Sequence, residues 1–149
     1  MRLKHTLIHS GTAVDNPHQY NVVIGTDMGQ FSGTVVCRPE DYAHESKFLG
    51  YELAEIKAEI AYARAQRDHW NARLKALTQF WREMADTRSY NVDAYWVKKI
   101  RKEVDEADKR VTYWTETVSY LKEAYYTKIQ LFDASVKSRK IWEQKNGRD

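Results

Sequence analysis

Apolar residues recur at alternating steps of four and three along most of the chain, starting near residue 49. Heptad spacing sustained over many turns is typical of α-helices that pack against each other at a shallow angle. Two such lines are present, separated by a short segment that lacks the pattern. The first line is Leu49, Leu53, Ile56, Ile60, Ala63, Arg67, Trp70, Leu74, Leu77, Trp81 and Met84, and the second is Val97, Ile100, Val104, Ala107, Val111, Trp114, Val118, Leu121, Tyr125, Ile129, Phe132 and Val136.

The two lines predict two long helices, which we place at residues 45–86 and 92–145. From Tyr51 to Asn146 the chain contains neither glycine nor proline, so no strong helix breaker interrupts them. A bend of only about 5–7 residues makes the helices antiparallel neighbours. At about 1.5 Å per residue, the first helix is about 60 Å long and the second about 80 Å.

The first part of the chain follows a different pattern. Both prolines and five of the six glycines lie within the first 50 residues. Apolar and polar residues mix at strand-like spacing in "RLKHTLIH", and "YNVVIG" and "FSGTVVC" are rich in β-branched and aromatic residues. We expect a small antiparallel sheet with strands near residues 2–9, 19–24 and 30–37, and a hairpin loop at residues 25–30.

The segment "CRPEDYAHES" is typical of a helix entrance. Pro39 suits a first helical position, and Glu40 and Asp41 place negative charge near the positive end of the helix dipole. We expect a short first turn that breaks near residues 44–46 before the main helix begins. The predicted fold class is therefore α+β: one domain of residues 1–149, with a β-rich part at 1–38 and a long antiparallel helical hairpin after it.

Composition narrows the class of protein. The chain has 149 residues, a formal net charge of +3 and a single cysteine, Cys37, which excludes an intrachain disulfide. No apolar run approaches the roughly 20 residues that span a bilayer, and the first residues lack the apolar core of a secretory signal. We therefore expect a protein of a reducing cytoplasm that does not bind membranes. The charge excess is too weak to indicate nucleic-acid binding by itself.

Several aromatic residues lie off the two apolar lines. A small sheet cannot cover the flanks of so long a hairpin, and exposed apolar flanks usually mark an interface. We therefore expect a homo-oligomer. The residues concerned are Tyr62, Phe80, Tyr95, Tyr113, Tyr120 and Tyr126.

Catalytic and metal-binding motifs are not recognisable. Gly25, Gly29 and Gly33 are not followed by the Lys-Ser/Thr pair of a phosphate-binding loop. Neither His5 with His9 nor Cys37 with His44 supplies a compact four-ligand zinc pattern. We therefore predict a protein that is not an enzyme and that uses no metal or cofactor.

The bend between the helices is unusual. The segment "FWREMADTRSYNVDAYW" holds five aromatics, Phe80, Trp81, Tyr90, Tyr95 and Trp96, although such bends are usually short and polar. These rings could simply clamp the hairpin end. Arg82, Arg88 and Asn91 are interleaved with them, and flat rings, guanidinium groups and an amide together suit a nucleotide-like ligand.

Two further polar residues have both a structural and a functional interpretation. Arg67 occupies a core-type position, where a charge is costly unless it is paired. It could pair with an acid of the second helix, such as Glu103 or Asp108, or it could line an anion site at the side of the hairpin. Asn91 is placed to cap the second helix, and a helix N-terminus also presents donors to anions.

With these features the chain resembles a known family, the phage-encoded Thoeris anti-defence sponges that capture cyclic ADP-ribose signals. The resemblance covers roughly residues 20–120 and includes "FSGTVVCRPEDYAHESKFLGYELAEIKAEI" before the helical hairpin. It implies an aromatic and an asparagine near the helix junction as ligand contacts, here Phe80 or Trp81 together with Asn91. It also implies sequestration of a cyclic nucleotide in the host cytoplasm without degradation. The last thirty residues extend beyond the family pattern.

Two other classes of function fit the same sequence. A structural or adaptor oligomer would use the hairpin only for assembly. A nucleic-acid-binding protein would use the basic excess and the terminal "KSRKIWEQKNGR", and its binding would weaken strongly with salt because each phosphate contact releases counterions.

Overall fold

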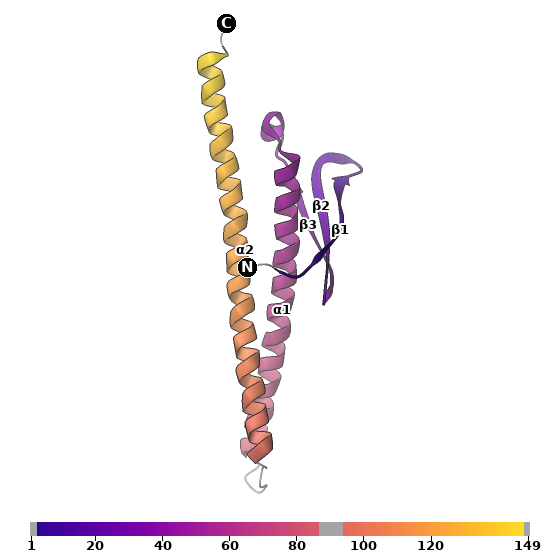
Figure 1. Cartoon of the computed structure of the whole chain (residues 1–149), viewed down its shortest axis with the longest axis vertical. Coiled ribbons are helices and arrows are strands. Elements are labelled where there is room, and N and C mark those ends of the chain that lie inside the picture. Colours follow the sequence, from indigo (N-terminus) through magenta and orange to yellow (C-terminus); the bar gives the residue numbers. More distant parts are fainter. Residues whose placement is uncertain (1–2, 87–93, 148–149) are drawn as a thin grey trace. The chain divides into compact units, whose positions relative to one another are not determined.

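The computed structural model describes residues 3–86 and 94–147, and it confirms the α+β class. A three-stranded antiparallel sheet precedes a short 3-10 helix and two long α-helices (Figure 1). The helices form the antiparallel hairpin that the apolar lines predict. The elements are β1 (Thr6–Ala13), β2 (Asn16–Thr26), β3 (Gly29–Val36), η1 (Pro39–His44), α1 (Lys47–Asp86) and α2 (Ala94–Asn146).

The sheet has the order β1-β2-β3, with β2 in the centre. Alternate residues of β2, Tyr20, Val22 and Ile24, are almost fully buried, as the period of two in a strand requires. β2 and β3 join through a tight turn in which Thr26 pairs with Gly29. Gly29 has a φ of 111°, a conformation that glycine adopts without strain. The predicted hairpin loop is confirmed and is shorter than expected.

The first hairpin is longer than its apolar pattern indicates. β1 continues to Ala13 and β2 begins at Asn16, whereas we expected strands to end at residue 9 and to resume at residue 19. The ladder between β1 and β2 is held by main-chain hydrogen bonds, which do not require apolar side chains. The polar ends of these two strands therefore leave no signal in the hydropathy pattern. The register shifts between Thr12 and Ala13, and Pro17 lies in this irregular part, where a missing N–H is tolerated.

The predicted helix entrance is confirmed. η1 ends at His44, and Glu45 has an extended ψ of 131°, so the first turn does not continue into α1. Ser46 then caps α1, because its hydroxyl oxygen accepts a hydrogen bond from the Leu49 N–H at 3.2 Å.

By internal contacts the chain divides into two compact units, Met1–Tyr62 with Ser119–Asp149, and Ala63–Val118. In the first unit, β3 lies directly on α1. A Cβ atom added to Gly33 would lie 2.7 Å from the Ala58 nitrogen and would also collide with the Ala54 carbonyl oxygen. α2 also contacts α1 within this unit, where Lys128 pairs with Glu52.

The second unit contains only helix. Arg73 of α1 lies 3.8 Å from Glu103 of α2, and Arg110 lies over the Trp70 ring. From Trp70 to Arg73 along α1, the contacted residue of α2 moves back from Arg110 to Glu103. The two helices therefore run antiparallel in this unit too.

The two predicted apolar lines form the helix seam. Every residue of both lines is buried or half-buried. The buried ones are Leu53, Ile56, Ala63, Ile100, Ala107, Trp114, Val118, Leu121 and Val136.

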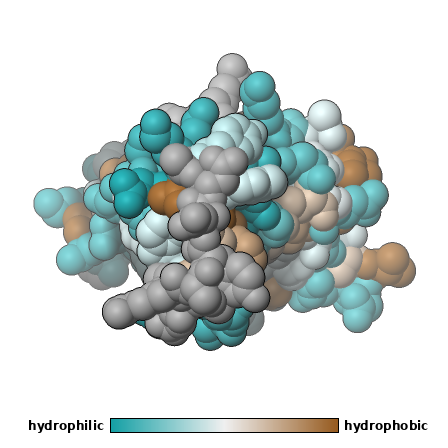
Figure 2. Space-filling model, turned by 90° about the horizontal axis from the view of Figure 1, so that it is seen from below, coloured by the Kyte–Doolittle hydropathy of each residue, from teal (hydrophilic) through white to brown (hydrophobic). Residues whose placement is uncertain are grey.

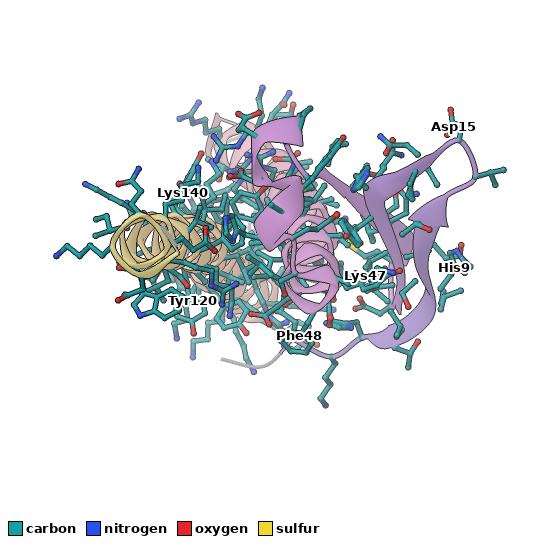
Figure 3. The ribbon with its side chains drawn as sticks, turned by 90° about the horizontal axis from the view of Figure 1, so that it is seen from above. His9, Asp15, Lys47, Phe48, Tyr120 and Lys140 are labelled. Atoms are coloured by element: carbon teal, nitrogen blue, oxygen red, sulfur yellow. The ribbon has the colours of Figure 1, made fainter. Side chains whose placement is uncertain are left out.

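The prediction that Tyr62 lies on an exposed flank is wrong. Tyr62 is 5% exposed, packs near Phe31 of β3, and donates a hydrogen bond to Asp27 at 2.6 Å. The sheet covers this face of α1, which the helix pattern alone could not show. The other flank residues are exposed, and Figure 3 shows one of them, Tyr120, on α2. Phe48 of α1, which was not among the predicted flank residues, is exposed too. Among the described residues, no helix is both long and apolar enough to cross a membrane.

Candidate functional site

A small pocket lies between the two helices in the Ala63–Val118 unit, near the bend. Thr78 and Trp81 of α1 and Arg101 and Val104 of α2 line it, and its volume is about 200 Å³. The Arg101 guanidinium carbon lies 5.7 Å from the centre of the Trp81 ring, within the range of a cation–π contact. Trp81 belongs to the apolar line but is only half-buried, and it contributes to the pocket lining.

The arginines of this unit differ in whether they are neutralised. Arg73 lies 3.8 Å from Glu103, and Arg110 lies 3.7 Å from Glu106. Arg101 and Arg82 pair with no carboxylate among the residues that the structure describes. An unpaired guanidinium beside an aromatic ring is a site where an anion can bind with little competition.

The surrounding sequence adds to this positive charge. Residues 80–102 contain six Lys/Arg and three Asp/Glu, which gives a formal charge of +3, as large as that of the whole chain. Lys98, Lys99, Arg101 and Lys102 follow one another on the first turns of α2 with no acid between them. This stretch of sequence therefore carries a net positive charge equal to that of the whole chain, and Arg101 of it lines the pocket.

The structure places only some of the predicted site residues. Trp81 lines the pocket, whereas its neighbour Phe80 is 51% exposed and is not part of the lining. Arg88, Tyr90 and Asn91 lie outside the described residues. Tyr95 and Trp96 are exposed, and the Lys99 ammonium lies 5.1 Å from the Trp96 ring centre.

Arg67 does not belong to this pocket. It lies 14 positions before Trp81 on the same helix, a separation of about 21 Å along the axis. The expected ion pair with the second helix is also wrong, because the Arg67 Nε lies 3.4 Å from Asp68 of its own helix while Glu103 pairs with Arg73. The long Arg67 side chain is about one-third exposed, so it reaches the surface from a seam position.

Sequence reasoning missed Arg101 and Thr78 as lining residues. Arg101 comes from the second helix, and its place opposite Trp81 depends on how the helices are paired. The available signal was the run of cations "KKIRK" close to the bend, combined with an antiparallel register.

A second pocket, of about 300 Å³, lies in the other unit where β3, η1 and the two helices meet. Its lining is largely apolar and includes Val35, Leu53 and Phe132. Arg38 at its edge is already engaged, with Asp41 at 2.9 Å and Asp133 at 3.3 Å. Because this guanidinium is neutralised, the pocket suits an apolar group better than an anion.

A hydrogen-bonded group fixes η1 to the sheet. Glu45 accepts a hydrogen bond from the Tyr20 hydroxyl at 2.5 Å, and its carboxylate lies 2.7 Å from His18 Nδ1. Burial acts to raise the pKa of Glu45, but the hydrogen bonds from Tyr20 and His18 and the positive charges of His18 and Lys47 leave it below its usual value. This group is structural, because its polar atoms form hydrogen bonds with one another.

The same unit brings together three side chains that the sequence did not connect, His5, Glu55 and Glu59. Burial, and secondarily the charge of Glu55, raise the pKa of Glu59 to about 7. The signal that could have found this group was the spacing of four between the two glutamates on a predicted helix.

Comparisons with known proteins gave no match: no protein-family model, no curated protein and no solved structure is similar to this chain.

Proposed function

We propose that this protein binds and sequesters a cyclic ADP-ribose-type signalling nucleotide without degrading it. The observation that carries the proposal is the pocket in which Arg101, unpaired among the described residues, lies against Trp81. The resemblance to the anti-defence sponges agrees with it and would place the protein in the cytoplasm of an infected host. On this proposal, the protein lowers the free concentration of an immune signal by tight binding.

The chemistry of the pocket favours a nucleotide over a neutral ligand. An aromatic ring can stack on a base, and such stacking is worth roughly 1–3 kcal/mol per base. Arg101 can approach a pyrophosphate, because it lines the pocket and pairs with no described carboxylate. The pocket is too small for a whole nucleotide and would hold one end of the ligand. We assign this end to the base, because Trp81 in the lining can stack on it.

The lining supports binding rather than reaction. Thr78, Trp81, Arg101 and Val104 supply stacking, positive charge and apolar contact. The Thr78 hydroxyl donates to the Leu74 carbonyl at 2.8 Å, so it is held by its own helix. None of these four groups is a general base near neutral pH.

We further propose that the protein works as a homo-oligomer whose interface is formed by exposed aromatic residues of the helices. Tyr113, Tyr120 and Tyr126 are between 42% and 62% exposed. Their rings are large and apolar and favour contact with a second copy. Figure 2, seen from below, shows hydrophobic residues in separate patches among hydrophilic ones.

Calorimetric titration with cyclic ADP-ribose isomers tests the proposal. Wild-type protein should bind at least one isomer tightly, and the ligand should be recovered intact and in stoichiometric amount after heat denaturation. Trp81→Leu keeps apolar volume but removes the stacking face, so affinity should fall by about one to two decades.

Trp70→Leu is the matched control. Trp70 also lies on the apolar line beside an arginine, Arg110 at 5.2 Å, but that guanidinium pairs with Glu106. The control should fold and bind as the wild type does. Absence of heat with every cyclic nucleotide, or equal losses in Trp70→Leu and Trp81→Leu, would reject the pocket as the binding site.

A further inference from the structure

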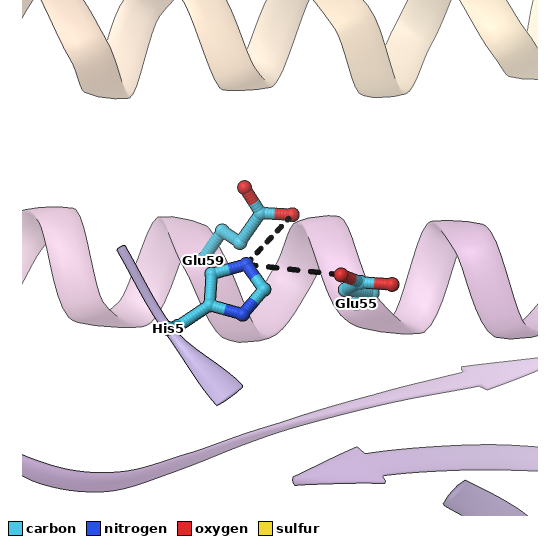
Figure 4. A group of neighbouring side chains, drawn as sticks. All are labelled: His5, Glu55 and Glu59. Atoms are coloured by element: carbon cyan, nitrogen blue, oxygen red, sulfur yellow. Dashed lines mark ion pairs between the residues drawn. The ribbon is translucent and has the colours of Figure 1, made fainter. Parts of the chain in front are cut away.

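A histidine and two glutamates converge where the segment before β1 meets α1. His5 directly precedes β1, and Glu55 and Glu59 lie one turn apart on the same face of α1 (Figure 4). The His5 Nε2 atom lies 3.7 Å from a Glu55 oxygen and 3.9 Å from a Glu59 oxygen. One ligand atom from each residue lies within 4.8 Å of the other two.

The two separations from His5 Nε2 are close to those between ligand atoms in a metal coordination sphere. With metal–ligand bonds of about 2.1 Å, neighbouring ligand atoms lie about 3.0–3.4 Å apart. A contraction of a few tenths of an ångström would bring both glutamate oxygens to that distance from His5 Nε2. Glutamate rotamers can supply this movement without moving the helix.

The charges of the group also favour a cation. Two carboxylates face one imidazole, and among the described residues no lysine or arginine pairs with either glutamate. The side chains of His5 and Glu59 are only 14% and 17% exposed, so solvent screens them weakly. A divalent ion would neutralise both carboxylates at once.

The orientation of the imidazole fits the same interpretation. His5 Nδ1 is buried and has no hydrogen-bond partner among the described residues, so the contacts of the ring's polar atoms are all on the Nε2 side. Neutral imidazole binds a metal through the nitrogen that lacks a proton. With the proton on Nδ1, His5 presents Nε2 to the two carboxylates.

We infer that His5, Glu55 and Glu59 bind a first-row divalent transition-metal ion of the Zn²⁺ type. One nitrogen and two carboxylate oxygens form a mixed set that such ions accept, whereas Ca²⁺ and Mg²⁺ prefer oxygen ligands alone. Three protein ligands leave at least one coordination position for water. The bound ion fixes the segment before β1 to α1 and thereby stabilises the sheet against the helix.

Tag-free protein, freed of metal by chelation, is titrated with Zn²⁺ by calorimetry. We expect one ion per chain and a higher melting temperature when the ion is bound, because only the folded chain brings the ligands together. His5→Gln and Glu59→Gln should each weaken binding at least ten-fold. Co²⁺ should give visible d–d absorption bands in the wild type that both variants lose.

Matched controls separate this site from adventitious binding. His9→Gln removes an exposed histidine of β1, which Figure 3 shows on the outer part of the sheet. Glu123→Gln removes an exposed glutamate of α2. Both should bind Zn²⁺ like the wild type.

Glu55→Gln keeps the test valid if the more buried variants do not fold. Its side chain is 41% exposed, so its metal-free melting temperature should match that of the wild type while its Zn²⁺ affinity falls. The inference is overturned if metal-free wild type shows no Zn²⁺ binding. It is equally overturned if folded Glu55→Gln binds Zn²⁺ as tightly as the wild type.

Discussion

Gly33 of β3 lies so close to the main chain of Ala54 on α1 that no side chain fits between them. The sheet therefore approaches the helix backbone directly, and the small side chains of Ala54 and Ala58, both fully buried, line the contact. This approach seats the sheet over a second face of α1, distinct from the seam that faces α2.

Gly33→Ala should destabilise the protein by about 1–3 kcal/mol, the usual cost of overpacking a tight contact. The added methyl group meets helix backbone, which cannot move aside as a flexible side chain would. Urea unfolding measures the change. Ser32→Ala, at the adjacent exposed position of β3, should stay within about 0.5 kcal/mol of the wild type. Equal stability of the two variants would contradict the close contact.

Acid should destabilise the protein through Glu45. Its pKa is lower in the folded chain than in the unfolded chain, so the folded state favours the ionised carboxylate. This contribution to stability is present above the unfolded pKa near 4.5 and is lost as the pH falls through the lower folded pKa.

Glu45→Gln should therefore lower the stability at neutral pH and flatten its dependence below about pH 4.5. Urea unfolding at a series of pH values measures both effects. The exposed Glu123→Gln provides the comparison and should keep the wild-type profile. A Glu45→Gln curve parallel to that of the wild type would exclude this role for the carboxylate.

Arg101→Met should weaken nucleotide binding by about one to two decades, because a hydrogen bond to a charged group contributes about 1.5–3 kcal/mol. Methionine preserves the apolar stem that lies against Trp81, so the melting temperature should change little. Arg110→Met removes the guanidinium that pairs with Glu106 and should leave affinity unchanged. Calorimetry with the isomer that binds the wild type best gives the comparison, and similar affinities for all three proteins would exclude Arg101 from the site.

The mass in solution should be an even multiple of 17.6 kDa, the mass of one chain. Light scattering at micromolar concentration measures it. Tyr120→Glu places a charge on an exposed ring position and should lower the mass, because an unpaired charge is costly in an interface. Lys122→Glu changes an exposed charged position nearby and is the control. A wild-type mass of one chain would refute the oligomer.

The Trp81 pocket could be predicted only in part. Sequence spacing indicated a site at the bend and included Trp81, because aromatic rings and arginines are concentrated there. It also included Arg67, which pairs with Asp68 at about 21 Å along α1 from Trp81. It left out Arg101, which is 20 positions from Trp81 in the sequence yet lines the same pocket.

The sequence by itself determined the local elements, because helix and strand periods and glycine and proline positions act within a few residues. The seam of the hairpin follows from them: every residue of the two apolar lines is buried or half-buried. α1 has a second covered face besides the seam with α2, and only the tertiary structure decided that the sheet covers it. In a hairpin of two helices alone, residues off the apolar line face solvent. The sheet instead buries three of them, Ala54, Ala58 and Tyr62. The same packing brings His5 to Glu55 and Glu59, because contacts between distant segments depend on how the elements are seated and not on their spacing along the chain.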